Sequence, residues 1–147
     1  MSQYADAAEA MFKQGYNCAQ AVLARCGGAG NLSHDQAVKV AAAFGGGIAH
    51  LDQTCGAVTG ALMALGLRVA TADAGGKHKA YAAAQEFARR FVARHASIRC
   101  TDLLGVSIAT PEGLEQAKAK GLFKAACPKL VRDACDILDE ILAEKPQ

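Results

Sequence analysis

Stretches of helix-forming residues, ended by glycines or opened by capping residues, divide this sequence from end to end. Alanine alone contributes 33 residues and β-branched residues are few, a composition that favours helices over strands. The expected helices cover residues 2–14, 18–26, 33–44, 55–72 and 77–96, followed by a short helix from Thr110 and Pro111 and a last helix from Cys127 and Pro128. The sequence therefore predicts an all-α fold.

Several of the expected helix ends carry a local signal. Asn17 can cap the second helix, and Ser33 with Gln36 forms a capping-box pattern that opens the third. The glycine-rich residues 27–30 stop the second helix. Residues 45–47, all glycine, end the third helix and open a loop.

The length and the short connections indicate one domain. A chain of 147 residues buries about two-thirds of its unfolded surface and needs no disulfide or bound metal in order to fold. Short connections make consecutive helices antiparallel neighbours. We therefore expect residues 1–147 to form a single antiparallel bundle of about six to seven helices.

Charge and composition exclude several classes of partner. The formal net charge is +2 and aromatic residues make up 5% of the chain, so no nucleic-acid surface is expected. The apolar stretch 55–72 is interrupted by glycines and by Arg68, so no membrane span is expected. The first residues show no secretory pattern, which predicts a cytoplasmic protein.

The Gly- and Ala-rich faces of a small bundle would also suit a homodimer.

The cysteines carry most of the functional information. No Cys-x-x-Cys or Cys-x-x-Cys-His pattern occurs, which argues against a thioredoxin-like site, a zinc ribbon, a clustered ferredoxin site and attached haem. A cytoplasmic chain keeps its thiols reduced, so disulfides are the less favoured interpretation. The sequence contains six cysteines, at positions 18, 26, 55, 100, 127 and 135.

Helix order places some of these cysteines together. If consecutive helices alternate in direction, Cys18, Cys55 and Cys100 fall at one end of the bundle. Cys127 joins them if the short helix before it lies across that end.

The other two cysteines lie outside this set. Cys26 and Cys135 are each eight residues further along their helices than Cys18 and Cys127, or roughly 12 Å at 1.5 Å per residue. Both fall on apolar helix faces, so we expect them to be buried as small hydrophobic side chains.

A set of four thiols at helix starts suits two kinds of chemistry. Cys18, Cys55 and Cys127 lie in an expected cap or first helical turn, where the helix dipole favours thiolate. Thiolates bind zinc or an iron–sulfur cluster. A thiolate at Cys55 or Cys127 could instead exchange with a disulfide. A plain bundle with buried thiols is a further interpretation.

Other residues share this end of the bundle. Gly56 and Gly60 lie on one helix face, where small residues admit another backbone or a cofactor. Close helix packing explains them on their own, but the neighbouring Cys55 makes them candidate cofactor-binding residues. We expect His50 to be an exposed loop residue and His95 to be a helix C-terminal cation.

This cysteine pattern resembles the C_GCAxxG_C_C family of redox-active proteins. The resemblance rests on Cys18, on residues 55–60 (CGAVTG), on Cys100 and on Cys127, and it runs over nearly the whole chain. It implies that these four cysteines form the site, that the role is redox, and that an iron–sulfur cluster is bound. A related helical domain occurs in split-Soret cytochromes c, but this chain has no haem-attachment motif, so haem is not implied.

We therefore predict an electron carrier or accessory redox protein rather than a stand-alone enzyme. Its metal ligands would be Cys18, Cys55, Cys100 and Cys127, holding an iron–sulfur cluster. Its partner would be an oxidoreductase or a transporter-associated redox protein. The alternatives are a thiol–disulfide oxidoreductase that uses two of these cysteines, and a structural module with a four-cysteine zinc site.

Overall fold

Helices form almost all of the regular structure, and the all-α prediction is confirmed. The computed structural model describes residues 2–26 and 32–144, and over these residues it contains no β-strand, only an isolated bridge between Thr54 and Arg99. Two short helices, α4 and α7, raise the count above the six or seven expected. The elements are α1 (Ala5–Lys13), α2 (Cys18–Arg25), α3 (His34–Ala41), the 3₁₀ turn η1 (Ala42–Phe44), α4 (Gly45–His50), α5 (Gly56–Val69), α6 (Lys77–His95), α7 (Cys100–Leu104), α8 (Pro111–Ala119) and α9 (Leu122–Glu144).

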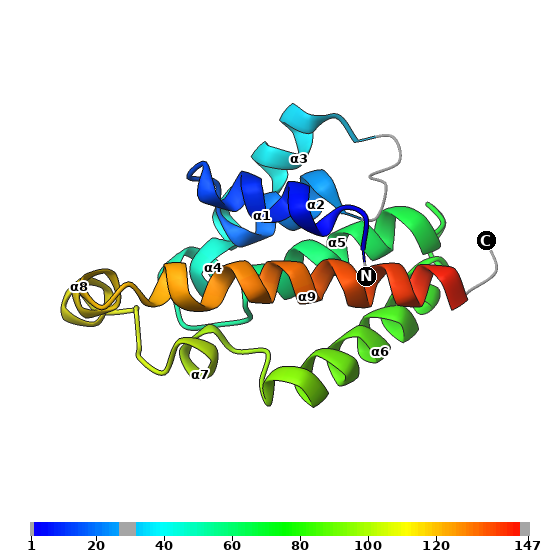
Figure 1. Cartoon of the computed structure of the whole chain (residues 1–147). Helices are drawn as coiled ribbons and strands as arrows, with labels where there is room; N and C mark the ends of the chain where they lie inside the picture. The colour runs from blue at the N-terminus through cyan, green and yellow to red at the C-terminus, as the bar shows by residue number, and fades with distance from the viewer. Residues whose placement is uncertain (1, 27–31, 145–147) are drawn as a thin grey trace.

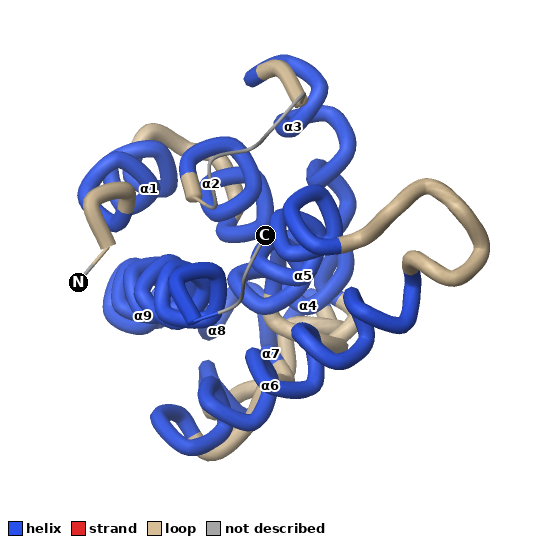
Figure 2. The backbone as a smooth tube through the Cα atoms, turned by 90° about the vertical axis from the view of Figure 1, so that its right-hand side faces the viewer, coloured by secondary structure: helices blue, strands red, loops and turns tan. Residues whose placement is uncertain are grey.

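The longest helix, α9, organises the bundle. It runs the length of the molecule, with α1 and α2 on one side and α6 on the other (Figure 1). Seen nearly along α9, helix α5 lies between α2 and α6 (Figure 2). Helix α5 packs against α2, α6 and α9, and α1 packs against α9. Most of the largest buried side chains come from these five helices, and they include Phe87, Phe91, Met11, Leu23 and Leu65.

Both predicted capping signals are confirmed. The Asn17 side chain accepts the Gln20 N–H at 2.8 Å, and the Gln20 side chain accepts the Asn17 N–H at 2.9 Å. Ser33 and Gln36 form the same reciprocal pair at the start of α3. The predicted stop at residues 27–30 lies outside the residues that the structure describes.

The predicted start of the last helix was wrong. Helix α9 begins at Leu122, directly after Gly121 at φ 65°, and Pro128 lies inside it. Leu122 and Phe123 pack against a small apolar cluster around Cys100. This packing holds the turns before Pro128 helical, although proline removes one hydrogen bond of the helix ladder.

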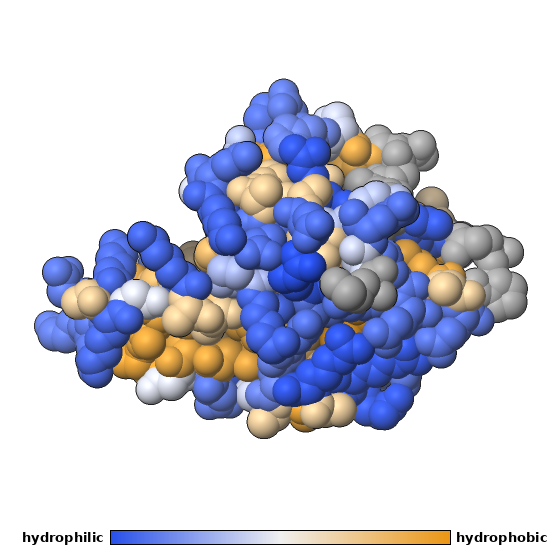
Figure 3. Space-filling view, viewed as in Figure 1, coloured by the Kyte–Doolittle hydropathy of each residue, from blue (hydrophilic) through white to orange (hydrophobic). Residues whose placement is uncertain are grey.

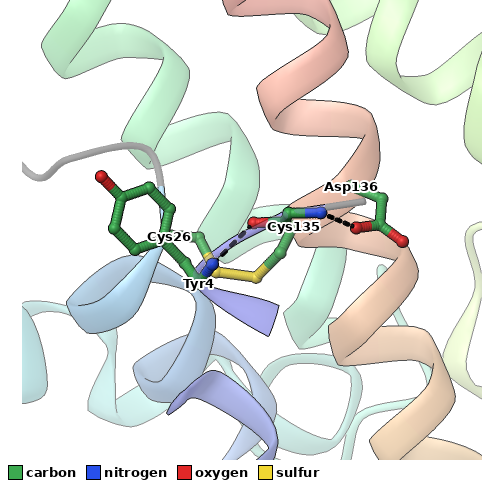
Figure 4. The surroundings of a disulfide bond; sticks show 5 residues. Tyr4, Cys26, Cys135 and Asp136 are labelled. Atoms are coloured by element: carbon green, nitrogen blue, oxygen red, sulfur yellow. Dashed lines mark hydrogen bonds between the residues drawn. A yellow bond between two sulfur atoms is a disulfide. The ribbon is translucent and has the colours of Figure 1, made fainter. Parts of the chain in front are cut away.

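Cys26 and Cys135 form a disulfide, so the prediction of two unpaired buried thiols was wrong. Their Cα atoms are 5.6 Å apart and both residues are completely buried. The bond joins the end of α2 to the middle of α9, beside Tyr4 and Asp136 (Figure 4). The two cysteines are 109 residues apart, so no local pattern signals the pairing. The cytoplasmic location stays a prediction.

Helix α5 contains most of the apolar stretch 55–72, for which no membrane span was expected. Its apolar stretch spans 14 residues and ends at Val69. Over the part of the chain that the structure describes, no helix has the length and apolar character that a bilayer span requires.

Gly60 sets the contact between α5 and α2. A Cβ on Gly60 would lie 2.7 Å from the backbone oxygen of Ala19, whereas a Cβ on Gly66 would meet no atom within 4 Å. We expect Gly60→Ala to lower the free energy of unfolding by about 1–3 kcal/mol, because it overpacks the contact. Gly66→Ala should raise it by up to about 1 kcal/mol, because alanine is the better helix former. Urea unfolding compares the two variants, and equal stability would contradict the close contact.

Candidate functional site

Cys18 and Cys55 lie at the starts of two helices that pack together. Cys18 is the first residue of α2, and Cys55 is the N-cap of α5. Asn17 holds the start of α2 in place, because its side-chain amide also donates to the carbonyl of Ala42 at 3.0 Å. A Cβ on Gly56 would overlap the sulfur of Cys18. The glycine therefore allows the first turn of α5 to approach the Cys18 thiol directly.

A short backbone pairing brings Cys100 beside Cys55. The Cys55 N–H donates to the carbonyl of Ile98 at 2.7 Å, and the Cys100 N–H donates to the carbonyl of Gln53 at 2.8 Å. Cys100 then begins α7. Two segments far apart in the sequence are thus joined where each of them carries a cysteine.

Cys127 completes the set from α9. It lies in the second turn of that helix, not in the first as predicted. Figure 1 shows α8 lying across the end of the bundle at which α9 begins, the arrangement expected to bring Cys127 to the other cysteines. All four thiols are free, are 5–9% exposed and line one cavity of about 320 Å³. The remaining lining residues include Phe12, Leu103, Leu104, Phe123 and Leu130.

A left-handed turn closes one side of this cavity. The residues from Gly46 to His50 all have positive φ, between 53° and 68°. The sequence predicted a loop here, and three of these residues lack the glycine that such angles favour. The turn is also tight, because a Cβ on Gly47 would lie 2.6 Å from Cβ of Cys100. His50 is exposed as predicted, and it also lines the cavity.

Asp52 anchors this turn to the segment after α7. Its carboxylate accepts the Ile108 N–H at 2.9 Å and a short hydrogen bond from the Ser107 hydroxyl. The Ser107 hydroxyl and the Ile108 N–H lower the pKa of Asp52. Asp52 could not be predicted as part of the site, because its partners lie more than 50 residues away and no motif links them.

Cys18 is the thiol most easily ionised. The Cys55 thiol donates a hydrogen bond to it, and the N–H groups of Gly46, Ala19 and Cys18 itself point to its sulfur, so its pKa falls to about 7. The same contact and burial raise the pKa of Cys55 well above the ordinary value. The pair therefore loses its first proton near pH 7, and that proton leaves Cys18 while Cys55 stays protonated.

Cys100 and Cys127 are protonated at neutral pH in the metal-free chain. Burial raises the pKa of Cys100 to about 11 and that of Cys127 to about 12, and the negative charge of Cys18 adds to both effects. Thiols bind metal as thiolates, so loading this site would release protons.

Gly60 and His95, two further residues considered in the sequence, are not among the residues that line the cavity. Gly60 packs against the backbone of Ala19, so helix packing accounts for it. His95 is the last residue of α6, as predicted, and its Nε2 lies 2.8 Å from the Asp133 carboxylate.

The described donor side chains do not gather around a single point. Across residues 2–26 and 32–144, no three His, Cys, Asp or Glu side chains come close enough to hold one ion. The four thiols instead surround a cavity whose volume lies in the range of ligand pockets, roughly 300–1,000 Å³. The arrangement suits a group larger than one ion, and its protein ligands would be sulfur.

The strain in the left-handed turn gives a testable prediction. Ala49 has φ 53°, and alanine there costs about 1 kcal/mol relative to glycine. Ala49→Gly should therefore raise the free energy of unfolding by about 1 kcal/mol. Ala42, exposed nearby at φ −56°, is the control, and Ala42→Gly should lower stability by about 0.5–1 kcal/mol. Urea unfolding measures both, and a loss of stability in Ala49→Gly would contradict the strain.

Comparison with known proteins agrees with the cysteine pattern. A family model described as "Putative redox-active protein (C_GCAxxG_C_C)" matches residues 16–141, a stretch that contains all four cavity cysteines. No curated protein and no solved structure matches the chain. Since the family model covers most of the sequence and the cavity unites its cysteines, the chain belongs to the C_GCAxxG_C_C family of redox-active proteins.

Proposed function

We propose that Cys18, Cys55, Cys100 and Cys127 hold an iron–sulfur cluster and that the protein carries electrons for a partner oxidoreductase or transporter-associated redox protein. One observation carries the proposal: four free, buried thiols from four separate segments line a single cavity. Iron–sulfur clusters are held by four cysteine thiolates.

The spacing of the thiols favours a cluster over a zinc ion. A zinc site would gather four thiolates around one ion, with each Zn–S bond about 2.3 Å. The described residues contain no such group, and the thiols instead line a cavity of about 320 Å³. Gly56 leaves room beside Cys18 and belongs to the proposed site. Gly60, which packs on α2, would support the site only indirectly.

The chain's own residues would prepare this site for electron transfer. When bound, a cluster supplies a group that accepts and donates electrons. The N–H groups of Gly46 and Ala19 stabilise negative charge on the Cys18 sulfur. Phe12, Leu103 and Phe123 cover the cavity with apolar side chains. Hydrogen bonds to sulfur and exclusion of water are two of the means by which proteins set a cluster's potential.

Reconstitution without oxygen tests the proposal. The purified protein is incubated with ferrous iron, sulfide and a thiol reductant, then desalted. We expect visible absorbance that bleaches on reduction by dithionite and returns on reoxidation, with a paramagnetic resonance signal in one of the two states. A protein that stays colourless and binds zinc instead would contradict the proposal and favour the structural alternative.

A second function is favoured by the contact between Cys18 and Cys55. As a thiolate, Cys18 could attack a substrate disulfide and release one substrate sulfur as thiolate. Cys55, after giving its proton to that thiolate, would attack the Cys18 sulfur of the mixed disulfide and release the second. The substrate would gain two electrons, and a Cys18–Cys55 disulfide would form.

The pKa values predict which thiol of the metal-free protein reacts first. With iodoacetamide at pH 7, we expect Cys18 to be modified before Cys100 and Cys127. The Cys18 rate should fall as pH drops below about 7, because the thiol is then protonated. Cys100 and Cys127 should reach comparable ionisation only near pH 11 and 12. Peptide mass spectrometry measures the order, and equal labelling at pH 7 would contradict it.

A further inference from the structure

The charges of the chain are distributed unevenly along the sequence. Residues 116–131 contain four lysines and no acidic residue. The rest of the chain has 12 basic and 14 acidic residues, so it is slightly negative. The net charge of the whole chain is therefore small although one segment is basic. This segment runs from the end of α8 through the first turns of α9.

Helix stability does not explain the lysines at the start of α9. Acidic residues stabilise a helix N-terminus and basic residues stabilise its C-terminus. Helix α9 has no acidic residue in its first turn and no basic residue in its last. Two acidic residues in its later turns have partners: Glu140 and Glu144 form ion pairs with Arg90, and Glu140 also pairs with Arg94.

Several of the basic side chains are free to meet an external partner. Lys118, Lys120 and Lys124 are exposed and form no ion pair within the described residues. Lys13 and Lys129 are also exposed, and each pairs with an acidic residue of its own helix.

The basic segment covers the thiol cavity. Phe123, Cys127 and Leu130 line the cavity from the start of α9. Between the end of α1 and the first turns of α9, Lys13 and Lys124 flank a groove of about 420 Å³ whose apolar lining includes Phe12 and Pro128. Phe12 also lines the cavity. Figure 3 shows apolar surface between the start of α9 and α7, with hydrophilic side chains around it.

We infer that this basic face, residues 118–129 with Lys13, docks an acidic face of the protein's redox partner. The inference rests on the proposed redox function and adds where the partner binds and which charge it presents. Complementary charges steer association and set orientation, and an apolar centre within a charged rim is typical of protein interfaces. Docking here places the partner against the segment that contributes Phe123, Cys127 and Leu130 to the cavity lining.

The experiment measures binding without electron transfer. The probe is an acidic plant-type ferredoxin whose iron is replaced by gallium, so it binds but carries no electron. Calorimetry at low ionic strength compares the wild type with Lys120→Glu/Lys124→Glu. The matched control, Lys77→Glu/Lys79→Glu, makes the same charge change on exposed residues at the start of α6.

We expect the first double variant to weaken binding about tenfold or more, and the control to change it little. Binding should also weaken at high salt. Lys124→Glu improves the charge at the start of α9, whereas Lys120→Glu places an acidic residue at the C-cap of α8. Thermal melts therefore check that the double variant is folded at the temperature of the binding measurement. Equal weakening in both variants would overturn the inference. So would binding to anionic vesicles or duplex DNA with no binding to the ferredoxin.

The result is independent of the cluster. If the protein holds no iron but still binds the probe through Lys120 and Lys124, the docking face stands and the proposed cofactor fails. If iron is bound and the probe is not, the docking face fails alone.

Discussion

Replacing Cys55 by serine is expected to remove bound iron and visible colour from the protein. Cys55 lies at the centre of the site: it contacts Cys18, follows the backbone pairing that positions Cys100, and lines the cavity. Changing even the outer partners of a metal ligand costs about 10–100-fold in affinity, so loss of a ligand should cost at least as much. Iron and absorbance are measured on protein purified without oxygen.

The matched control removes two cysteines outside the cavity. Cys26→Ala/Cys135→Ala breaks the disulfide and leaves all four cavity thiols in place. It should retain iron and colour at a temperature where it is folded. Equal loss of iron in Cys55→Ser and in the control would count against the four-cysteine site.

The same control variant should show the largest loss of stability outside the cavity. A disulfide restricts the unfolded chain, and for a closed loop of about 100 residues the entropic stabilisation is about 4–5 kcal/mol, with measured losses of about 2–5 kcal/mol. For a chain of this size that corresponds to a fall in Tm of about 5–15 °C. Scanning calorimetry of metal-free wild type and variant measures it. A melting temperature equal to the wild type would show that the bond contributes little.

Contacts close to the disulfide should keep the N-terminal segment attached to α9 when the disulfide is removed. The Ser2 N–H donates to Asp136 at 2.5 Å, and Arg132 forms ion pairs with Asp6 and Glu9. These bonds also join the N-terminal segment to α9. We therefore expect the variant to melt earlier as one cooperative unit, with α1 still docked below the transition.

Much of the fold could be predicted because its signals are local. The capping pairs at Asn17 and Ser33 and the alanine-rich composition each follow from residues close in sequence. The start of α9 could not be predicted in this way. Its first turns are held by the packing of Leu122 and Phe123 on residues near Cys100, and that tertiary contact outweighs the local preference of Pro128.

The cysteines of the candidate site could be predicted from the sequence, but the left-handed turn and the Asp52 anchor beside them could not. Helix order alone placed Cys18, Cys55 and Cys100 at one end of the bundle, and all three line the cavity with Cys127. The left-handed turn could not be predicted, because Ala49 and its neighbours reach positive φ only through contacts made elsewhere. The anchor at Asp52 depends on partners that only folding brings near.

The disulfide shows a different limit of sequence reasoning. Distances along α2 and α9 correctly separated Cys26 and Cys135 from the cavity cysteines. These distances along each helix do not indicate how far apart α2 and α9 lie at the positions of Cys26 and Cys135. Only the packing of α2 against α9 brings the two Cα atoms to 5.6 Å.

The measurement that tests the central claim most directly is the metal content of the untreated protein. The chain is purified without oxygen, and iron, zinc and inorganic sulfide are measured on one sample together with its visible spectrum. We predict a brown protein with iron and sulfide in nearly equal amounts and little zinc. A colourless protein without iron or sulfide would contradict the cluster, and it would leave Cys18 and Cys55 as the reactive pair.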